Sequence, residues 1–143
     1  MTIASILRSK GNQVVSVRPD DLLGDVARTL VHHRIGAVLV RDGEAPPAGI
    51  LSERDIVRVF SEKDGATNTL TASDAMTRIL HTVTPDTPIT RALEMMTDRR
   101  VRHLPVLDGQ TLLGIVSIGD LVKARIEAAV GEAEALREYV TAT

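Results

Sequence analysis

Apolar residues along the chain follow two patterns that alternate, and these predict strands and amphipathic helices in turn. Short runs of valine, leucine, isoleucine and alanine are typical of buried strands, whereas an apolar residue at every third or fourth position is typical of a helix. In the first half, the predicted elements are a strand at 14–17, a helix at 22–33, strands at 37–40 and 49–51, and a helix from Ser52 to about Phe60. The dipeptide Asp42-Gly43 predicts a turn between the second and third of these strands.

The second half predicts the same order of elements. They are a strand at 80–83, a helix from Pro88, strands at 104–107 and 112–116 around the turn Asp108-Gly109, and a helix from about 118 to 140. Thr87 is a suitable N-cap for the first of these helices, with Pro88 as its first residue. The last helix is longer than its counterpart. Its apolar residues recur near the helical spacing, and Gly131 interrupts them. The polar stretch 61–75 predicts a linker between the halves.

The two halves also match residue by residue, which predicts a tandem repeat. The pattern of 17–43 recurs 66 positions later with seven of 27 residues identical, and five of the ten residues over 49–58 recur at an offset of 65. One copy is small for a domain of its own, so we predict an α/β fold of two β-α-β-β-α repeats packed with pseudo-twofold symmetry around a shared core. Such packing creates two equivalent clefts, where a ligand is expected. The predicted boundaries are 1–70 for the first repeat, 71–126 for the second and 127–143 for a helical extension.

Composition and charge exclude several classes of protein. A hydrophobic fraction of 43%, a charged fraction of 25% and a formal net charge of -2 are ordinary for a globular protein and give no basic surface for nucleic acid or anionic membranes. The chain has no cysteine, which excludes thiolate chemistry and disulfides. Its only Phe, Tyr or Trp residues are Phe60 and Tyr139, too few for the aromatic surfaces on which nucleic-acid bases stack. No apolar run is long enough to span a membrane and the start lacks the features of a secretory signal, so we expect a cytoplasmic protein.

The most specific motif is Gly-h-h-Ser-x-x-Asp, in which h is apolar, and it occurs once in each copy. It provides Ser52 and Asp55 in the first copy and Ser117 and Asp120 in the second. In one interpretation it is only a helix start, with the serine as N-cap and the aspartate completing a capping box. In the other it binds a ligand, because free N–H groups at a helix start favour phosphate and a carboxylate one turn later can accept hydrogen bonds from a ribose diol. Both interpretations can hold together.

A cluster of cations lies in the second copy, where 99–103 holds three arginines and a histidine. The first two arginines fit a solvated helix end, where cations suit the helix dipole. Arg102 and His103 stand at the start of a strand, where one of them should point toward a cleft and bind phosphate. The first copy has Gly36 and Ala37 near this position. That side is therefore less cationic, and Gly36 allows close approach of the backbone.

The sequence does not place residues for catalysis or for a metal. His32 and His33 are adjacent and point to different sides of a helix, which disfavours a metal site. No histidine is placed by the sequence to activate Ser52, and no set of carboxylates is clustered for a metal. We therefore expect no enzymatic activity, no metal and no catalytic cofactor.

These features resemble tandem cystathionine-β-synthase (CBS) domains, which together form a Bateman module. The resemblance covers roughly residues 1–126 and rests on three paired segments: Val-x-Pro at 17–19 and 83–85, the strands at 35–40 and 101–106, and the two Gly-h-h-Ser-x-x-Asp motifs. The second of these motifs is especially similar to the adenylate-binding segment in the γ subunit of AMP-activated protein kinase. The strand start 101–104 resembles the phosphate-contacting strand of that subunit with arginine and histidine in swapped order, which leaves open whether Arg102 or His103 reaches a phosphate.

The resemblance implies an adenosine ligand in the clefts: AMP above all, or ADP, ATP, NAD(H) or S-adenosylmethionine. It also implies that the serine and aspartate of one copy lie across a cleft from strands of the other. One implied site comprises Ser52, Asp55, Thr77, Thr82, Arg102 and His103, and the other comprises Lys10, Ser16, Gly36, Ala37, Ser117 and Asp120. Members of the family pair two modules into a disc, so we expect a homodimer in which the long last helix reaches the second copy.

The sequence therefore predicts a regulatory module that senses an adenine nucleotide and signals to an effector protein that the sequence does not identify. With no effector domain within its 143 residues, the chain resembles the stand-alone bacterial CBS-pair proteins. Two other functions stay open at this point. They are a dimerisation scaffold without a ligand and a small nucleotide-processing enzyme.

Overall fold

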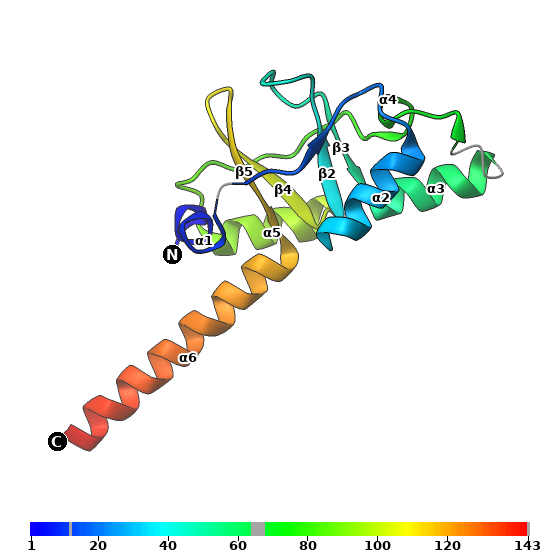
Figure 1. Cartoon of the computed structure of the whole chain (residues 1–143). Coiled ribbons are helices and arrows are strands. Elements are labelled where there is room, and N and C mark those ends of the chain that lie inside the picture. Colours follow the sequence, from blue (N-terminus) through cyan, green and yellow to red (C-terminus); the bar gives the residue numbers. More distant parts are fainter. Residues whose placement is uncertain (12, 64–67, 143) are drawn as a thin grey trace.

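The structure is a computed structural model that describes residues 1–11, 13–63 and 68–142 (Figure 1). The elements in chain order are α1 (Ile3–Lys10), β1 (Ser16–Val17), α2 (Leu23–His33), β2 (Ala37–Val40), β3 (Gly49–Ser52), α3 (Glu53–Lys63), α4 (Ala72–Ala75), α5 (Ile89–Arg99), β4 (His103–Asp108), β5 (Thr111–Ser117) and α6 (Ile118–Ala142). Helices pack on two small sheets, one from each half of the chain. The predicted tandem α/β fold is confirmed.

Each half of the chain builds its own sheet. In the first sheet β2 lies between β1, which runs parallel to it, and β3, which runs antiparallel to it. In the second, β4 and β5 form an antiparallel hairpin. The two predicted Asp-Gly turns contain Gly43 and Gly109 with φ of 58° and 62°, a conformation that glycine adopts without steric strain. β1 has two residues, fewer than the four predicted at 14–17.

The strand predicted at 80–83 is wrong, because only Val83 joins the second sheet. Its N–H donates to the Pro105 carbonyl at 3.0 Å, and its carbonyl accepts from the Leu107 N–H at 2.9 Å. To extend this parallel ladder, residue 105 would have to donate its own N–H to the carbonyl two residues before Val83, and proline has no N–H. The first copy has Leu39 at the position of Pro105 and forms β1.

Most of the buried hydrophobic residues form two clusters rather than the single shared core that we predicted. The first core is built on α2, β2, β3 and α3 and includes Ala72, Ala75 and Met76, from α4 and its end. The second is built on α5, β4, β5 and the start of α6 and includes Ile3 and Ile6 of α1. Figure 1 accordingly shows α1 beside the second sheet and α4 beside α2. The helix that precedes each repeat is thus packed on the other repeat, which ties the halves together.

The linker predicted at 61–75 is partly wrong. Helix α3 continues to Lys63 and α4 occupies the end of the stretch, while 64–67 lie outside the described residues. The Ala72 N–H donates to the Asp21 carbonyl at 2.8 Å and fastens α4 to the first half. The described part of this stretch is therefore a structural piece of the first core.

Thr87 is not the N-cap of α5, which corrects a further prediction. The Ala92 N–H donates to the Pro88 carbonyl at 3.1 Å, so Pro88 is the capping residue and the helix begins at Ile89. The Thr87 hydroxyl instead accepts a bond from the Thr84 N–H at 3.0 Å. This bond closes a turn just before the helix.

Gly49 and Gly114 occupy the same position in the two motifs, but an added methyl group would have different neighbours at the two positions. A Cβ at Gly49 would lie 2.8 Å from the carbonyl oxygen of Thr77 and 2.7 Å from Met76 Sδ, so the backbone would have to move. A Cβ at Gly114 would meet only the end of the Leu7 side chain, at 2.8 Å, and that side chain can rotate away. We expect Gly49→Ala to lower the free energy of unfolding in urea by about 1–3 kcal/mol and Gly114→Ala to lower it less. Equal losses would show that both contacts relax with the same ease.

Helix α6 starts in the second half and leaves it as a long projection (Figure 1). Leu121 is buried and Ala124 packs against the second core, whereas every residue from 129 to 142 is exposed. The helix continues through Gly131 and ends at Ala142, two residues past its predicted end. No helix in the described part of the chain is both long and apolar enough to cross a membrane.

Candidate functional site

The first Gly-h-h-Ser-x-x-Asp motif joins β3 to α3 and caps the start of that helix. Asp55 Oδ2 accepts hydrogen bonds from the Ser52 N–H at 2.9 Å and the Ser52 hydroxyl at 3.1 Å, and the Asp55 N–H donates to Ser52 Oγ at 3.3 Å. Asp55 Oδ1 accepts from the Thr77 hydroxyl at 3.1 Å and from the Arg58 guanidinium at 3.4 Å. Asp55 is buried, with 9% of its surface exposed, and both of its oxygens are engaged.

The second motif joins β5 to α6 in the same manner. Asp120 Oδ2 accepts from the Ser117 N–H at 2.9 Å, and the Asp120 N–H donates to Ser117 Oγ at 3.1 Å. The same Oδ2 forms an ion pair with Lys10 Nζ at 2.7 Å. Within 1–11, 13–63 and 68–142, no group donates to Asp120 Oδ1. Both predicted capping boxes are confirmed, and in the second the described hydrogen bonds to the carboxylate all go to Oδ2.

Each aspartate meets a residue from the segment that precedes the other repeat. Thr77, which follows α4, contacts Asp55, and Lys10, which ends α1, contacts Asp120. The exchange of α1 and α4 between the two cores brings these contacts about. Two of the predicted site residues, Thr77 and Lys10, therefore do lie at the predicted aspartates.

The two contacts differ in how their segments are fastened to the sheets. Thr77 and Ile50 exchange two backbone hydrogen bonds, at 3.0 and 2.8 Å. In the second half, Lys10 Nζ donates to the carbonyl of Ile115, the counterpart of Ile50, at 2.8 Å. A side-chain ammonium group thus takes the place of a backbone N–H, so the Asp120 side is fastened by a side chain rather than by the backbone.

Gly36 and His103 face each other at the junction of the two halves. A Cβ on Gly36 would lie 3.3 Å from His103 Cε1 and 3.6 Å from Glu53 Oε1, so glycine permits this close approach. The Gly36 carbonyl accepts from the Glu53 N–H at 3.0 Å, and the Arg102 carbonyl accepts from the Ile118 N–H at 2.8 Å. Each of these bonds lies within one copy, and the two bonds occupy equivalent positions in the two copies. They therefore support the pseudo-twofold relation.

Strand register decides which predicted residues are neighbours at this junction. Ala37 pairs with Ser52 across β2 and β3, and His103 pairs with Ser117 across β4 and β5. His103 is therefore a strand neighbour of the second motif, although the resemblance implied that it belongs with the first. Through Gly36 it also reaches the first half, so it stands between the two motifs.

The surroundings of His103 favour its neutral form. Burial is the main cause that lowers the pKa of His103, the positive charge of Lys10 lowers it further, and Glu53 and Asp120 raise it in part. The net pKa is below the ordinary 6.5, so the imidazole is neutral at pH 7 and offers one N–H donor and one acceptor. A bound anion would favour the protonated form.

Asp120 is ionised at neutral pH. Burial raises the pKa of Asp120, but the hydrogen bonds from Lys10 and Ser117 and the charge of Lys10 outweigh it and bring the pKa below 3.8. An ionised carboxylate only accepts hydrogen bonds. Asp120 is therefore suited to receive hydroxyl donors rather than to give a proton.

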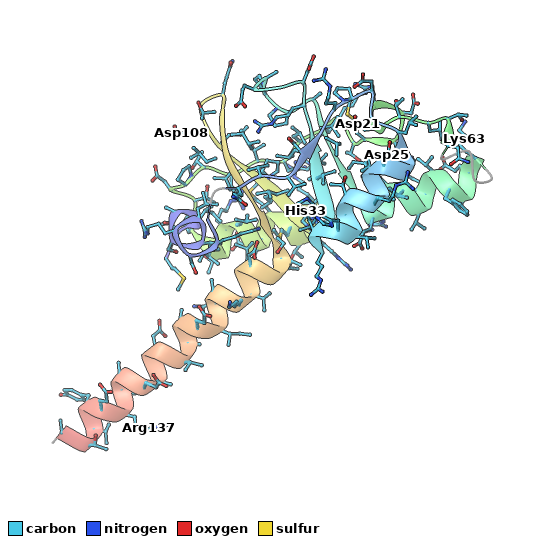
Figure 2. The ribbon with its side chains drawn as sticks, viewed as in Figure 1. Asp21, Asp25, His33, Lys63, Asp108 and Arg137 are labelled. Carbon is cyan, nitrogen blue, oxygen red and sulfur yellow. The ribbon has the colours of Figure 1, made fainter. Side chains whose placement is uncertain are left out.

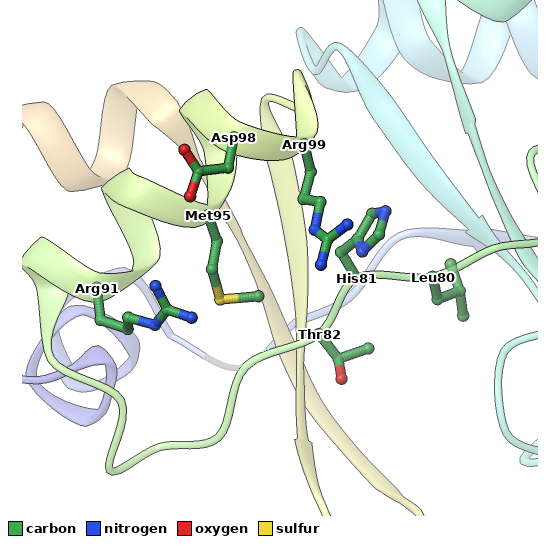
Figure 3. A pocket seen from close by; sticks show the side chains of 7 residues that line it. All are labelled: Leu80, His81, Thr82, Arg91, Met95, Asp98 and Arg99. Atoms are coloured by element: carbon green, nitrogen blue, oxygen red, sulfur yellow. The ribbon is translucent and has the colours of Figure 1, made fainter.

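Three other predicted residues have no hydrogen bond or ion pair to either aspartate in the described contacts. Ser16 is exposed on β1, and Arg102 is exposed just before β4. Thr82 lines a cavity of about 310 Å³ between the chain that follows Thr77 and helix α5 (Figure 3). Whether these three residues bind a ligand stays a prediction.

The polar lining of the cavity beside Thr82 includes two arginines, a histidine and the acidic residue Asp98. Figure 3 shows the Arg99 and His81 side chains close to each other, while Arg91 and Met95 point toward the same space. Neither of the motif aspartates lines this cavity, and Thr82 is the one residue of the implied site at Asp55 among the residues that line it.

Two residues near the junction were missed by sequence reasoning. Glu53 lies beside Gly36 and also lines a second cavity of about 440 Å³, between α2 and α3, whose other walls are mostly aliphatic. Arg58 binds Asp55, and its spacing of three residues along a helix could have suggested the contact. No signal in the sequence pointed to Glu53. No group of three or more His, Asp or Glu residues in the described ranges could hold a metal ion.

Comparison with known proteins finds two copies of one domain family in the chain. A family model described as CBS domain matches residues 4–62 and again 72–127. The mitochondrial CBS domain-containing protein CBSX3 of Arabidopsis thaliana is 35% identical over 147 residues, covering 97% of this chain and 71% of that protein. The crystal structure of the CBS-domain containing protein ATU1752 from Agrobacterium tumefaciens is 39% identical with a TM-score of 0.84, covering 87% of this chain and 99% of that one. The CBS domain pair of protein MJ0100, solved in complex with 5′-methylthioadenosine and S-adenosyl-L-methionine, is 22% identical with a TM-score of 0.76, covers 87% of this chain and 98% of its own, and supports the fold alone.

Proposed function

The chain belongs to the CBS-domain family, with two CBS domains in tandem, and from this premise we propose that it is a regulatory module that binds an adenine nucleotide where its halves meet. Asp120 carries the proposal: its carboxylate is ionised, held at a helix start by Ser117 and Lys10, and has an oxygen to which no described residue donates. A ribose diol provides hydroxyl donors for such an oxygen. The MJ0100 domain pair, which shares this fold, was solved with two adenosyl ligands, and the proposal extends that ligand class to this chain. AMP is the ligand expected first, with ADP, ATP, NAD(H) and S-adenosylmethionine as alternatives.

The two aspartates differ as ligand residues. Asp55 already accepts bonds from Thr77 and Arg58 through the oxygen that a ribose would need, whereas the equivalent oxygen of Asp120 is available. A ligand at Asp55 must first displace one of these partners, which reduces its net binding energy. We therefore propose that the site at Asp120 fills first and the site at Asp55 fills more weakly.

The phosphate of the ligand would be bound by the cations around His103. The positive charges of Lys10 and Arg102 both lower the pKa of His103, whereas Glu53 and Asp120 raise it, so charges of both signs act on this imidazole. A phosphate there would raise the pKa of His103, because an adjacent anion stabilises the imidazolium form. Binding would then be accompanied by proton uptake by His103 at pH values between its lowered pKa in the free chain and its higher pKa in the complex.

The proposed role is sensing rather than catalysis, because the motif residues act as helix caps and hydrogen-bond acceptors. A homodimer completes the proposal. Val57 and Phe60 of α3 and Val122 and Ile126 of α6 are exposed, and a second copy would cover such apolar surface. The cytoplasmic location and the effector protein stay predictions.

A thermal-shift titration with AMP, ADP, ATP, NAD(H) and S-adenosylmethionine tests the proposed function. A ligand that binds only the folded chain stabilises it by about 2.7 kcal/mol at 100 times its dissociation constant, which raises the melting temperature measurably. We expect at least one of the five to do so, and GMP to do so less. No shift with any of them would favour the scaffold, and turnover of any of them would favour the enzyme.

Arg102→Ala is expected to weaken ATP binding more than adenosine binding. The Arg102 side chain is exposed beside His103, so its contribution is a screened contact with phosphate. About 1 kcal/mol corresponds to a roughly fivefold weaker affinity for ATP, with adenosine nearly unchanged. Calorimetry with both ligands measures the difference, and Arg28→Ala on α2 is the charge-matched control. Equal losses for ATP and adenosine would limit Arg102 to a role in folding.

A further inference from the structure

Apolar residues on α6 follow a heptad repeat that continues past the second CBS domain, whose match ends at residue 127. They alternate at spacings of four and three: Val122, Ile126, Ala129, Ala133, Leu136 and Val140. These spacings place the six residues, here called the stripe, at the a and d positions of a coiled coil. Val122, Ile126 and Leu136 are 43%, 58% and 64% exposed. The stripe is thus an apolar surface in contact with water.

The projecting part of α6, residues 129–142, needs support from outside the body of the molecule. All of its side chains are exposed, and Figure 2 shows them pointing away from the helix on every side, Arg137 among them. Helices shorter than about 12–15 residues are marginal in water. Gly131 weakens this one further relative to alanine, because glycine loses more conformational freedom when it becomes helical. Burial of the stripe against another helix would supply the missing stability.

We propose that two copies of this chain join their α6 helices along the stripe as a parallel, two-stranded coiled coil. The charges beside the stripe favour the parallel direction. In a parallel pair, Glu132 at a g position faces Arg137 at the following e position of the second copy, and symmetry makes this contact twice. In an antiparallel pair with Ala129 opposite Ala133, Lys123 would approach Arg137 and Glu132 would approach its own counterpart. Like charges would then meet on both sides.

The body of the molecule leaves the stripe accessible. Leu121 and Ala124 turn toward the second core. At about 3.6 residues per turn, the stripe lies roughly a third of a turn away from these two residues. A second helix can therefore pack along the stripe without displacing α6 from the second core. This pairing rests on the proposed homodimer and adds the segment, the register and the direction of contact.

Cysteine cross-linking tests the pairing, because the chain has no cysteine of its own. Ala129→Cys and Ala133→Cys place thiols on the stripe, and Ala135→Cys, at another exposed alanine that lies away from the stripe, is the matched control. In a parallel pair each of the first two variants forms a disulfide-linked dimer by itself under mild oxidation, and the control forms far less. Cross-linking only in an equal mixture of Ala129→Cys and Ala133→Cys would show an antiparallel pair and overturn the proposal. No preference for the stripe over the control would overturn it too.

Leu136→Glu separates this proposal from the proposed function. Leu136 is exposed and far along α6 from Asp120, so the variant should fold and keep its nucleotide-induced thermal shift. We expect sedimentation at micromolar concentration to show at least a tenfold weaker dimer. If the dimer is unchanged, the interface lies elsewhere and the coiled coil is wrong, while nucleotide binding and the homodimer stand. A wild-type chain that sediments as a monomer would overturn the coiled coil and the homodimer without touching nucleotide binding.

Discussion

Ile3→Ala is expected to lower the free energy of unfolding by about 2–5 kcal/mol, the usual loss when a large aliphatic side chain is removed from a core. Ile3 has no exposed surface and packs in the second core, although it stands near the start of the chain. The substitution leaves a cavity between α1 and the strands of the second half. Equilibrium unfolding in urea, followed by circular dichroism, measures the loss.

Ile79→Ala is the matched control. Ile79 is 74% exposed, and the substitution removes the same side-chain atoms from the surface instead of from the core. We expect it to change the free energy of unfolding by no more than about 0.5 kcal/mol. If Ile3→Ala were equally mild, α1 would not be a stable part of the second core. Lys10 ends the same helix, so the contact of Lys10 with Asp120 would then also lack its support.

Helix α1 shows why part of the fold could not be predicted from the sequence. It has eight residues, and its buried positions Ile3 and Ile6 pack against a core encoded in the other half of the chain. Helix α4 is shorter still and was hidden in a polar stretch that indicated a linker. In contrast, α2 and the strands β2 and β3 carry strong local patterns, and their predicted positions agree with the structure within about two residues.

The second sheet shows a different limit of sequence reasoning. The segment that ends in Val83 has the residues of a strand, and the repeat predicts one there. Pairing, however, depends on the opposite strand, where Pro105 has no N–H to donate. Local propensity was therefore correct about the extended conformation of Val83 and wrong about the strand.

In the candidate site, too, the contacts within one helical turn could be predicted from the sequence, and the contacts between distant segments could not. Its two capping boxes could be predicted because serine and aspartate three residues apart contact each other within one helical turn. Lys10 and Thr77 were assigned to the aspartates only through the family resemblance, since no local pattern connects them to these residues. Glu53 escaped because its place beside Gly36 depends on how the two halves meet.

Asp120→Asn is expected to weaken nucleotide binding by tenfold or more, because a hydrogen bond to a charged group contributes about 1.5–3 kcal/mol and each 1.4 kcal/mol is a factor of ten. The amide keeps one acceptor, which can still receive the Ser117 N–H, so the capping box and the fold should persist. Its NH₂ group replaces a carboxylate oxygen and cannot accept a ribose hydroxyl. Calorimetric titration with AMP measures the affinity. Asp108→Asn, in the exposed hairpin turn, is the control and should bind AMP like the wild type.

Comparison with Asp55→Asn tests whether the two sites differ as proposed. Asp55 already has partners on both oxygens, so its replacement should reduce AMP affinity less and stability more. Acid titration adds an independent readout at Asp120. Because the pKa of Asp120 is lowered in the folded chain, its ionised form stabilises the fold above pH 3.8, and this stabilisation is lost as pH falls through the folded pKa. The difference in the free energy of unfolding between Asp120→Asn and the wild type should therefore become smaller in acid. If both asparagine variants bind AMP as tightly as the wild type, the repeated aspartate only caps a helix, and the nucleotide contact at these motifs is wrong.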